Sequence, residues 1–228
     1  MFGLTKPKLP VTEAKQRWID GCFRRLASLV GAQRLFEATV VLPTAEHFPD
    51  RYDRSEDALR GMFCRVAIWL QMNPADIDLR LFVTGEGMTR EFLPFFSGTT
   101  SAAGGLYHHD PTVRPQISIN QDQMKDPVAL VATLAHELGH VILLRPGLVD
   151  RDDPDMEQLN DLLMVFLGFG IFTANSAFRF KQHSDNTSQG WSATRLGYLS
   201  EEELGYALSR FAFERGEQKP QWPILLLT

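Results

Sequence analysis

Two histidines and a glutamate lie together in one short apolar stretch, residues 133–142 (Thr-Leu-Ala-His-Glu-Leu-Gly-His-Val-Ile). His136 and His140 are four residues apart, so on an α-helix their imidazoles project from the same face, one turn apart. Two imidazole nitrogens in that arrangement can bind one Zn²⁺, while Glu137 can act as a base at the open position of the metal. The spacing therefore predicts a hydrolytic zinc site.

A catalytic zinc site usually has three protein ligands and one position for water, so a third ligand is needed. The metzincin continuation of the motif is excluded, because Leu143 and Pro146 stand where that class has Gly and His. The best candidate is Glu157, which an antiparallel helix after the loop 145–154 would bring back beside the histidines. The competing carboxylates lie in this loop or in the first turn of the helix, where the helix dipole favours acids anyway: Asp150, Asp152, Asp153 and Asp155.

Asp161 lies one turn after Glu157, on the same face of the expected helix. A carboxylate there can accept the free N–H of a ligand histidine and so fix its tautomer and ring orientation. Two carboxylates on an otherwise apolar helix are costly to bury without such partners. We therefore expect Asp161 to orient a metal ligand; the alternative is a chance match of the motif in a helix that binds no metal.

The two motifs together, His136-Glu137-Leu-Gly-His140 and Glu157-Gln-Leu-Asn-Asp161, resemble those of the gluzincins, the thermolysin-like zinc metallopeptidases. The resemblance implies that both histidines and Glu157 are ligands, that Glu137 is the general base and that Asp161 is the orienting acid. It also implies a small sheet whose edge strand binds an extended substrate just before the motif helix.

The resemblance covers about residues 105–175, and the whole chain looks like small bacterial proteins of this zincin type. In gluzincins, a downstream His or Tyr stabilises the oxyanion. We rank Tyr198 and His183 first for that role, ahead of Arg195 and of Tyr206, which we expect to be a core tyrosine in the last helix.

The resemblance implies an α+β, zincin-like fold with a small sheet packed on the HExxH helix, and the remaining pattern predicts a helical C-terminal half. We expect one domain, 1–228, with an α/β part over 1–120 and a helical part that carries the metal site over 121–228. Caps and apolar spacing predict helices over 12–32, 55–72, 126–144, 153–175 and 200–216. Alternating or β-rich runs predict strands at Phe36–Leu42, Ile77–Val83, Gly105–His108 and Gln116–Asn120.

A segment rich in Gly, Ser and Thr, residues 84–105, predicts a long loop between the second and third of these strands. It is our candidate for a flap over the site. Its three aromatic side chains, which could equally line a specificity pocket or anchor the loop to the core, are Phe92, Phe95 and Phe96.

The composition is that of an ordinary globular protein, with 44% apolar and 22% charged residues among 228. A formal net charge of -5 argues against binding to nucleic acid or to an anionic membrane. No secretory signal is predicted in residues 1–25, and the most apolar segment, Leu162–Ala174, is shorter than the roughly 20 residues that span a bilayer. Cys22 and Cys64 are expected to be buried free thiols, so we expect a cytoplasmic protein.

These features predict a zinc metallopeptidase that holds one Zn²⁺ per chain and hydrolyses peptide or peptide-like amide bonds in a peptide or protein substrate. A catalytically silent zinc-binding protein on the same fold is the first alternative, and an α+β domain without a metal is the second. Glu137 favours the enzyme, because it contributes nothing to the ligand set.

Overall fold

The computed structural model describes residues 10–83, 105–108, 114–145, 148–185 and 199–225. The longer helices are α1 (Glu13–Leu26), α2 (Gln33–Glu37), α3 (Glu56–Trp69), α4 (Pro127–Leu143), α5 (Met156–Phe166), α6 (Gly170–Asp185) and α7 (Glu201–Glu214). The strands are β1 (Asp78–Phe82), β2 (Gly105–His108) and β3 (Gln116–Asn120). A π-helical segment, η1 (Ala27–Gly31), and three 3-10 turns complete the fold, namely η2 (Pro74–Asp76), η5 (Gln121–Lys125) and η7 (Trp222–Leu225). The fold is therefore of mixed α+β class and mostly helical.

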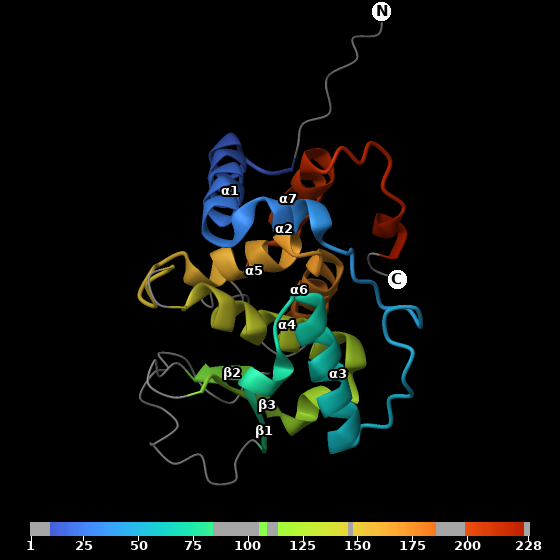
Figure 1. The fold of residues 1–228 in the computed structure, drawn as a ribbon. Helices are drawn as coiled ribbons and strands as arrows, with labels where there is room; N and C mark the ends of the chain where they lie inside the picture. The colour runs from blue at the N-terminus through green and yellow to red at the C-terminus, as the bar shows by residue number, and fades with distance from the viewer. Residues whose placement is uncertain (1–9, 84–104, 109–113, 146–147, 186–198, 226–228) are drawn as a thin grey trace, which may run out of the picture.

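The elements are stacked in three tiers (Figure 1). Helices α1, α2 and α7 lie at one end, α4, α5 and α6 lie in the middle, and the sheet with α3 lies at the other end. Helix α4 is the centre of this stack, because it packs against α3, α5, α6 and strand β2. The motif helix therefore contacts both the sheet and the helical half.

Among the described residues, the strands form one sheet in the order β1-β3-β2. β1 is parallel to β3, whereas β2 is antiparallel to it, with Leu106 opposite Ser118. The strands predicted at Gly105–His108 and Gln116–Asn120 are confirmed, and they pair with each other. β2 is consequently an edge strand of the described sheet, and it is the strand that packs most closely against α4.

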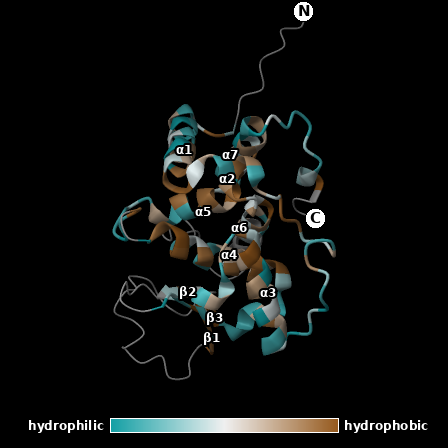
Figure 2. Cartoon of the chain, viewed as in Figure 1, coloured by the Kyte–Doolittle hydropathy of each residue, from teal (hydrophilic) through white to brown (hydrophobic). Residues whose placement is uncertain are grey.

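The start of α4 is set by local chemistry. The side chain of Asp126 accepts hydrogen bonds from the backbone N–H groups of Val128 and Ala129, and Pro127 occupies the first helical position. Almost all side chains from Leu130 onwards are buried, as expected for a helix that is apolar on every side. Figure 2 shows this contrast between the apolar central helices and the hydrophilic outer faces of α1 and α3.

One long helix was expected over 153–175, but the structure has two, α5 and α6. Gly168 separates them with a φ of 91°, a conformation that glycine adopts without strain. A Cβ at this position would lie 2.1 Å from the backbone oxygen of Thr39, so the bend also lets another segment approach closely. Helix α5 moreover begins at Met156, with Asp155 as its N-cap, two residues later than the Asp153-Pro154 signal indicated.

The strand expected at Phe36–Leu42 is also wrong. The structure has the end of α2 there, followed by an extended segment that pairs with no strand among the described residues. Val41, which is buried, instead donates its N–H to the carbonyl of Gly168 at 2.9 Å. Arg215 donates from Nη1 to the carbonyl of Ala38 at 2.7 Å. The backbone groups of Val41 and Ala38 are therefore hydrogen-bonded to residues at helix ends, Gly168 and Arg215, and not to a neighbouring strand.

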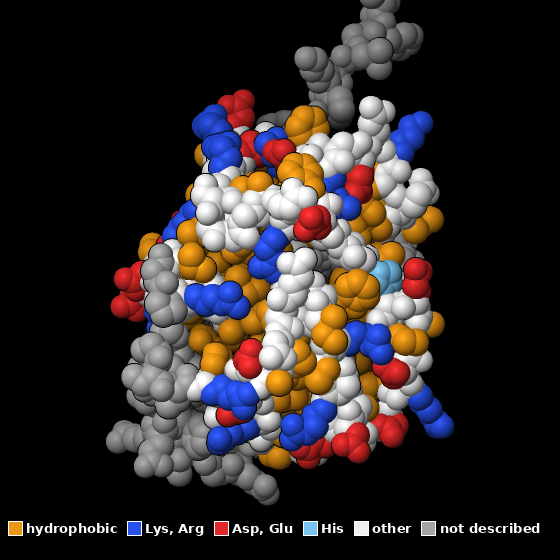
Figure 3. Space-filling view, viewed as in Figure 1, with side chains coloured by type: hydrophobic (Ala, Val, Ile, Leu, Met, Phe, Trp, Pro, Cys, Tyr) orange, Lys and Arg blue, Asp and Glu red, His pale blue; other side chains and the backbone are white. Residues whose placement is uncertain are grey.

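The other helix starts are confirmed. Thr12 and Ser55 cap α1 and α3 through their hydroxyls, and Ser200 forms the expected capping box with Glu203 at the start of α7. None of the helices in the described ranges is long and apolar enough to cross a membrane. On the face shown in Figure 3, basic and acidic side chains are interspersed.

Candidate metal centre

Helix α4 places the two motif histidines as their spacing predicts. The Nε2 atoms of His136 and His140 lie 3.2 Å apart, with the rings nearly perpendicular at an interplanar angle of 85°. Helix α5 brings Glu157 to the same point, with Oε2 at 3.1 Å from Nε2 of His136 and 3.6 Å from that of His140. These three residues form a group that could hold a metal ion.

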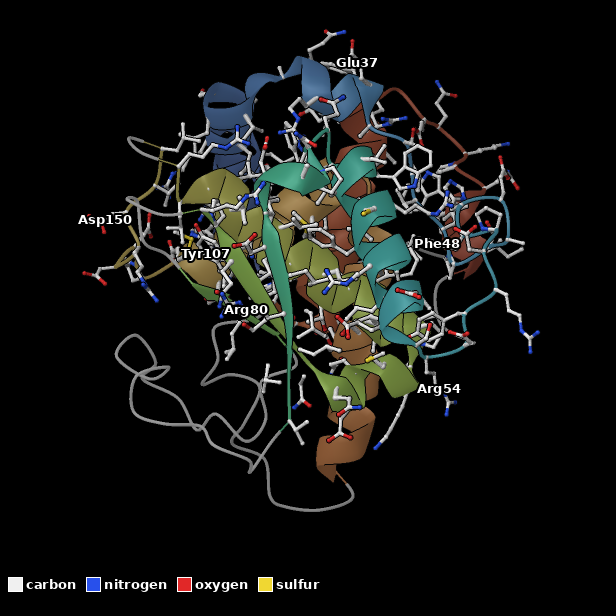
Figure 4. All side chains as sticks on the ribbon, turned by 60° about the horizontal axis from the view of Figure 1, so that its bottom comes forward. Glu37, Phe48, Arg54, Arg80, Tyr107 and Asp150 are labelled. Atoms are coloured by element: carbon white, nitrogen blue, oxygen red, sulfur yellow. The ribbon has the colours of Figure 1, made fainter. Side chains whose placement is uncertain are left out.

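Helix α1 holds the start of α5 in the position that makes this meeting possible. Arg25 pairs with Asp153 at 2.7 Å, and the indole N–H of Trp18 donates to Asp155 at 3.1 Å. Two of the competing carboxylates are therefore occupied by α1. The other two, Asp150 and Asp152, are exposed in the loop, and Figure 4 shows Asp150 at the periphery of the molecule.

Asp161 lies behind the group, on the other side of the His136 ring. Its Oδ1 is 3.3 Å from Nδ1 of His136, and its Oδ2 accepts the backbone N–H of Leu199 at 3.2 Å. The carboxylate is buried, so it favours the tautomer of His136 that carries its proton on Nδ1. In that tautomer, Nε2 of His136 could present its lone pair to a metal ion, whereas in the metal-free protein a protonated Nε2 donates to Glu157.

The spacing of the three ligand atoms fits zinc. In a tetrahedral site with bonds of about 2.0–2.2 Å, ligand atoms are about 3.3–3.5 Å apart. The distances of 3.1, 3.2 and 3.6 Å are close to that range. Two nitrogens and one carboxylate oxygen are also the donor types that zinc prefers. A cation is the natural partner for lone pairs that converge in this way.

Burial and neighbouring charges move the pKa values of the two glutamates in opposite directions. Burial raises the pKa of Glu137, an effect that the nearby His140 and His136 only partly offset. Burial would also raise the pKa of Glu157, but hydrogen bonds and charge from His136 and His140 outweigh it and hold the pKa below its ordinary value. Glu157 is thus ready to act as an anionic ligand, whereas Glu137 is a stronger base than a solvated carboxylate.

Strand β2 covers the motif helix on the side of Glu137. The backbone N–H of Tyr107 donates to the Glu137 carboxylate. A Cβ at Gly105 would lie 2.7 Å from Cγ2 of Thr133 and 2.9 Å from Cγ of Glu137, so glycine permits this close approach. The Tyr107 ring also lies parallel to the His140 ring, with centroids 6.3 Å apart; Figure 4 labels this side chain on β2.

Three residues of the site were not predicted from the sequence: Tyr107, Asn160 and Gly139. Tyr107 belongs to a strand whose pairing partner sets its direction, so no local signal marked it. Asn160 donates to the backbone carbonyl of His136 at 2.9 Å, and Gly139 lies against its side chain. A buried polar residue three positions after Glu157, hence on the same helix face, is the signal that could have found Asn160.

The structure describes only some of the residues that were predicted to stabilise the oxyanion. Tyr198 and Arg195 lie outside the described residues, as do the flap segment 84–104 and its phenylalanines. His183 belongs to α6, but its side chain lies outside the described part. Tyr206 does not lie at the metal group, because its hydroxyl donates to Asp20 of α1 at 3.2 Å while its ring packs against the core.

Of the two cysteines, Cys22 is buried as expected, whereas Cys64 is only half-buried, and both are free thiols. Burial, with Asp155 nearby, raises the pKa of the Cys22 thiol to about 11. Cys22 is therefore a protonated packing residue of α1 at neutral pH.

No protein-family model, no curated protein and no solved structure matches this chain. The geometry of the chain's own residues shows a group of two histidines and one glutamate that could hold a metal ion, supported by a buried aspartate.

Proposed function

We propose that the protein is a zinc-dependent metallopeptidase with a zincin-like fold, which hydrolyses peptide or peptide-like amide bonds. The observation that carries the proposal is the convergence of His136, His140 and Glu157 at distances that suit one Zn²⁺, with Asp161 behind His136. Asp161 lies against Nδ1 of His136, whose Nε2 faces a second imidazole and a carboxylate, an arrangement that a cation between these groups would stabilise.

Bound zinc would lower the pKa of a coordinated water and polarise the substrate carbonyl. Glu137 takes the proton from the attacking water on its carboxylate and then passes it to the leaving amine. Asp161 stabilises the ring orientation of His136 throughout.

The position of β2 supports a peptide as the substrate. An edge strand has backbone groups on its outer side that can pair with an extended chain, and this strand packs against the motif helix. Gly105 and Tyr107 lie next to Glu137, so a chain added along β2 would pass the base. Tyr198 and His183 stay our predictions for the group that stabilises the oxyanion.

One observation favours the second candidate, a catalytically silent zinc-binding protein. Glu137 is only 7% exposed, and its carboxylate already accepts a hydrogen bond from Tyr107. A carboxylate that is buried and already hydrogen-bonded has less access to a water molecule than an exposed one.

Metal analysis and the isosteric variant Glu137→Gln separate these candidates. We expect about one zinc per chain in both proteins, but a loss of peptide hydrolysis by about 10²–10⁴-fold in the variant, because an amide cannot accept the proton. Glu214→Gln, which changes an acid on α7 that pairs with Arg210, is the control and should cleave normally.

Two results would decide between the enzyme, the silent zinc-binding protein and a protein without zinc. If the wild-type protein binds zinc but cleaves no member of a peptide library, the silent candidate is the right one. If the protein takes up no zinc after expression with excess metal, both zinc proposals are wrong.

A further inference from the structure

Three polar side chains of α5 contact α4 from one face. Glu157, Asn160 and Asp161 are three and four residues apart, the spacing that aligns side chains on a helix. Glu157 contacts Nε2 of His136 at 3.1 Å and Asp161 contacts its Nδ1 at 3.3 Å. Asn160, which has no exposed surface, donates from Nδ2 to the backbone carbonyl of the same histidine at 2.9 Å. One residue of α4 is thus held at three points by α5.

The orientation of the Asn160 amide follows from its partner. A carbonyl needs a donor, so Nδ2 must face His136 and Oδ1 must face the opposite way. Oδ1 is buried and accepts no hydrogen bond from the described residues. Burying an amide oxygen in this state is unfavourable. An apolar side chain would avoid that cost, so the amide N–H must contribute something that an apolar residue cannot.

The carbonyl that Asn160 contacts belongs to the turn between the two motif histidines. In an α-helix, the carbonyl of His136 also accepts the N–H of His140. The Asn160 amide therefore binds at the backbone hydrogen bond that links the two ligands. A shift of α5 along α4 would break this contact and change the distance from Glu157 to both imidazoles together.

Gly139 makes room for this contact. A Cβ at position 139 would lie 2.1 Å from Oδ1 of Asn160, far below any real contact distance. Gly139 is not among the glycines with a positive φ, so its backbone would accept alanine. Glycine costs helix stability relative to alanine, so the space for Asn160 is the physical reason for glycine here.

We propose that Asn160 and Gly139 form a positioning contact that sets the register of α5 on α4 and thereby completes the metal centre. Asn160 is a positioning residue: it acts through the backbone of His136 and not as a ligand. This inference rests on the proposed zinc site and adds the device that holds Glu157 at bonding distance from the histidines.

The test compares Asn160→Leu and Gly139→Ala with the wild-type protein. The first replaces the amide with an apolar side chain of similar size, so the fold should survive while the donor is lost. Each variant should bind zinc roughly 10- to 100-fold more weakly, the usual effect of removing a group that orients a metal ligand. The Co²⁺-loaded variants should also show a shifted visible absorption spectrum, which a mere loss of stability would not cause.

A double variant tests whether the two residues act through one contact. Asn160→Ala removes the oxygen that a Cβ at position 139 would hit at 2.1 Å, and the other close atom, Cε of Met164 at 2.9 Å, is the end of a flexible side chain that can move. Gly139→Ala should therefore cost little zinc affinity beyond the loss caused by Asn160→Ala alone. Gly205→Ala is the matched control, because this helical glycine of α7 has no atom within 4 Å of the added Cβ. It should leave zinc affinity and the Co²⁺ spectrum unchanged.

Two results would overturn the inference. One is an Asn160→Leu variant with wild-type zinc affinity and an unchanged Co²⁺ spectrum; the other is a double variant whose loss equals the sum of the single losses. Both results leave the zinc site itself intact. A wild-type protein that binds neither zinc nor cobalt would instead contradict the proposed function as a whole.

Discussion

In the candidate metal centre, His136 has polar neighbours at both ring nitrogens and at its backbone carbonyl. Its Nε2 faces Glu157 and His140, its Nδ1 faces Asp161, and its backbone carbonyl accepts from Asn160. His140 differs, because its buried Nδ1 has no hydrogen-bond partner among the described residues. The two ligand rings are thus fixed by different means, one by polar partners and the other by packing beside Tyr107.

This difference gives a prediction for Tyr107, whose ring lies parallel to that of His140. Tyr107→Ala removes the ring that shields His140 from water, so we expect zinc affinity to fall by about tenfold, because the surrounding apolar shell tunes a metal site. Tyr107→Phe retains the ring and should stay within about twofold of the wild-type affinity. Chelator competition measures both. Equal losses in the two variants would assign the effect to the hydroxyl and refute a role for the ring.

At the scale of elements, the centre depends on how α5 begins and ends. Its start is tied to α1 through Arg25–Asp153 and Trp18–Asp155. Its end is the bend at Gly168, where the extended segment after α2 crosses and Val41 donates to the Gly168 carbonyl. Between these two anchors, α5 has little freedom to slide along α4.

The bend can be tested with two glycines of nearly equal φ. Gly168 (φ 91°) and Gly31 (φ 92°) both adopt a left-handed conformation, which costs roughly 1–2 kcal/mol for other residues. A Cβ at Gly31 meets nothing within 4 Å, whereas one at Gly168 would lie 2.1 Å from the Thr39 oxygen.

We expect Gly31→Ala to lower the free energy of unfolding by about 1–2 kcal/mol, and Gly168→Ala to lower it by about 1–3 kcal/mol more because the backbone must move. Urea denaturation with linear extrapolation measures both values. Similar losses in the two variants would mean that only φ matters and that the crossing segment is not tightly packed.

Considered as a whole, the molecule joins its tiers at the metal centre. The three residues that could hold a metal come from α4 and α5, β2 covers α4 on the sheet side, and the Leu199 peptide just before α7 binds Asp161. Segments far apart in the sequence therefore contact one another around this group. Metal bound at this point should stabilise the entire fold and not one helix pair.

Zinc at about 100 times its dissociation constant should raise the free energy of unfolding by about 2.7 kcal/mol, or the unfolding temperature by about 5–10 °C. The increase should be smaller in acid, because protons compete with the metal for imidazole nitrogens. Thermal unfolding with zinc or with a chelator, at neutral and at acidic pH, measures this. His140→Ala, which lacks a ligand, should show no zinc-dependent increase; an equal increase in that variant would place the bound zinc elsewhere.

The sequence by itself determined the features that depend on residues close together in the chain. Helix caps, the face shared by His136 and His140, and the face shared by Glu157 and Asp161 follow from helical geometry, and the structure brings these four side chains together. The α+β class with a small sheet against the motif helix was also predictable.

Only the tertiary structure decided the features that depend on distant partners. The run at 36–42 has strand-forming residues, but the hydrogen-bond acceptor nearest to Val41 is the carbonyl of Gly168, so no strand forms. Three other features also depend on contacts between segments that are distant in the sequence. They are the break between α5 and α6, the placement of β2 at the sheet edge and the contact of Asn160 with Gly139. Local propensities contribute tenths of a kcal/mol to about 1 kcal/mol per residue, and burial or a steric clash between distant segments outweighs them.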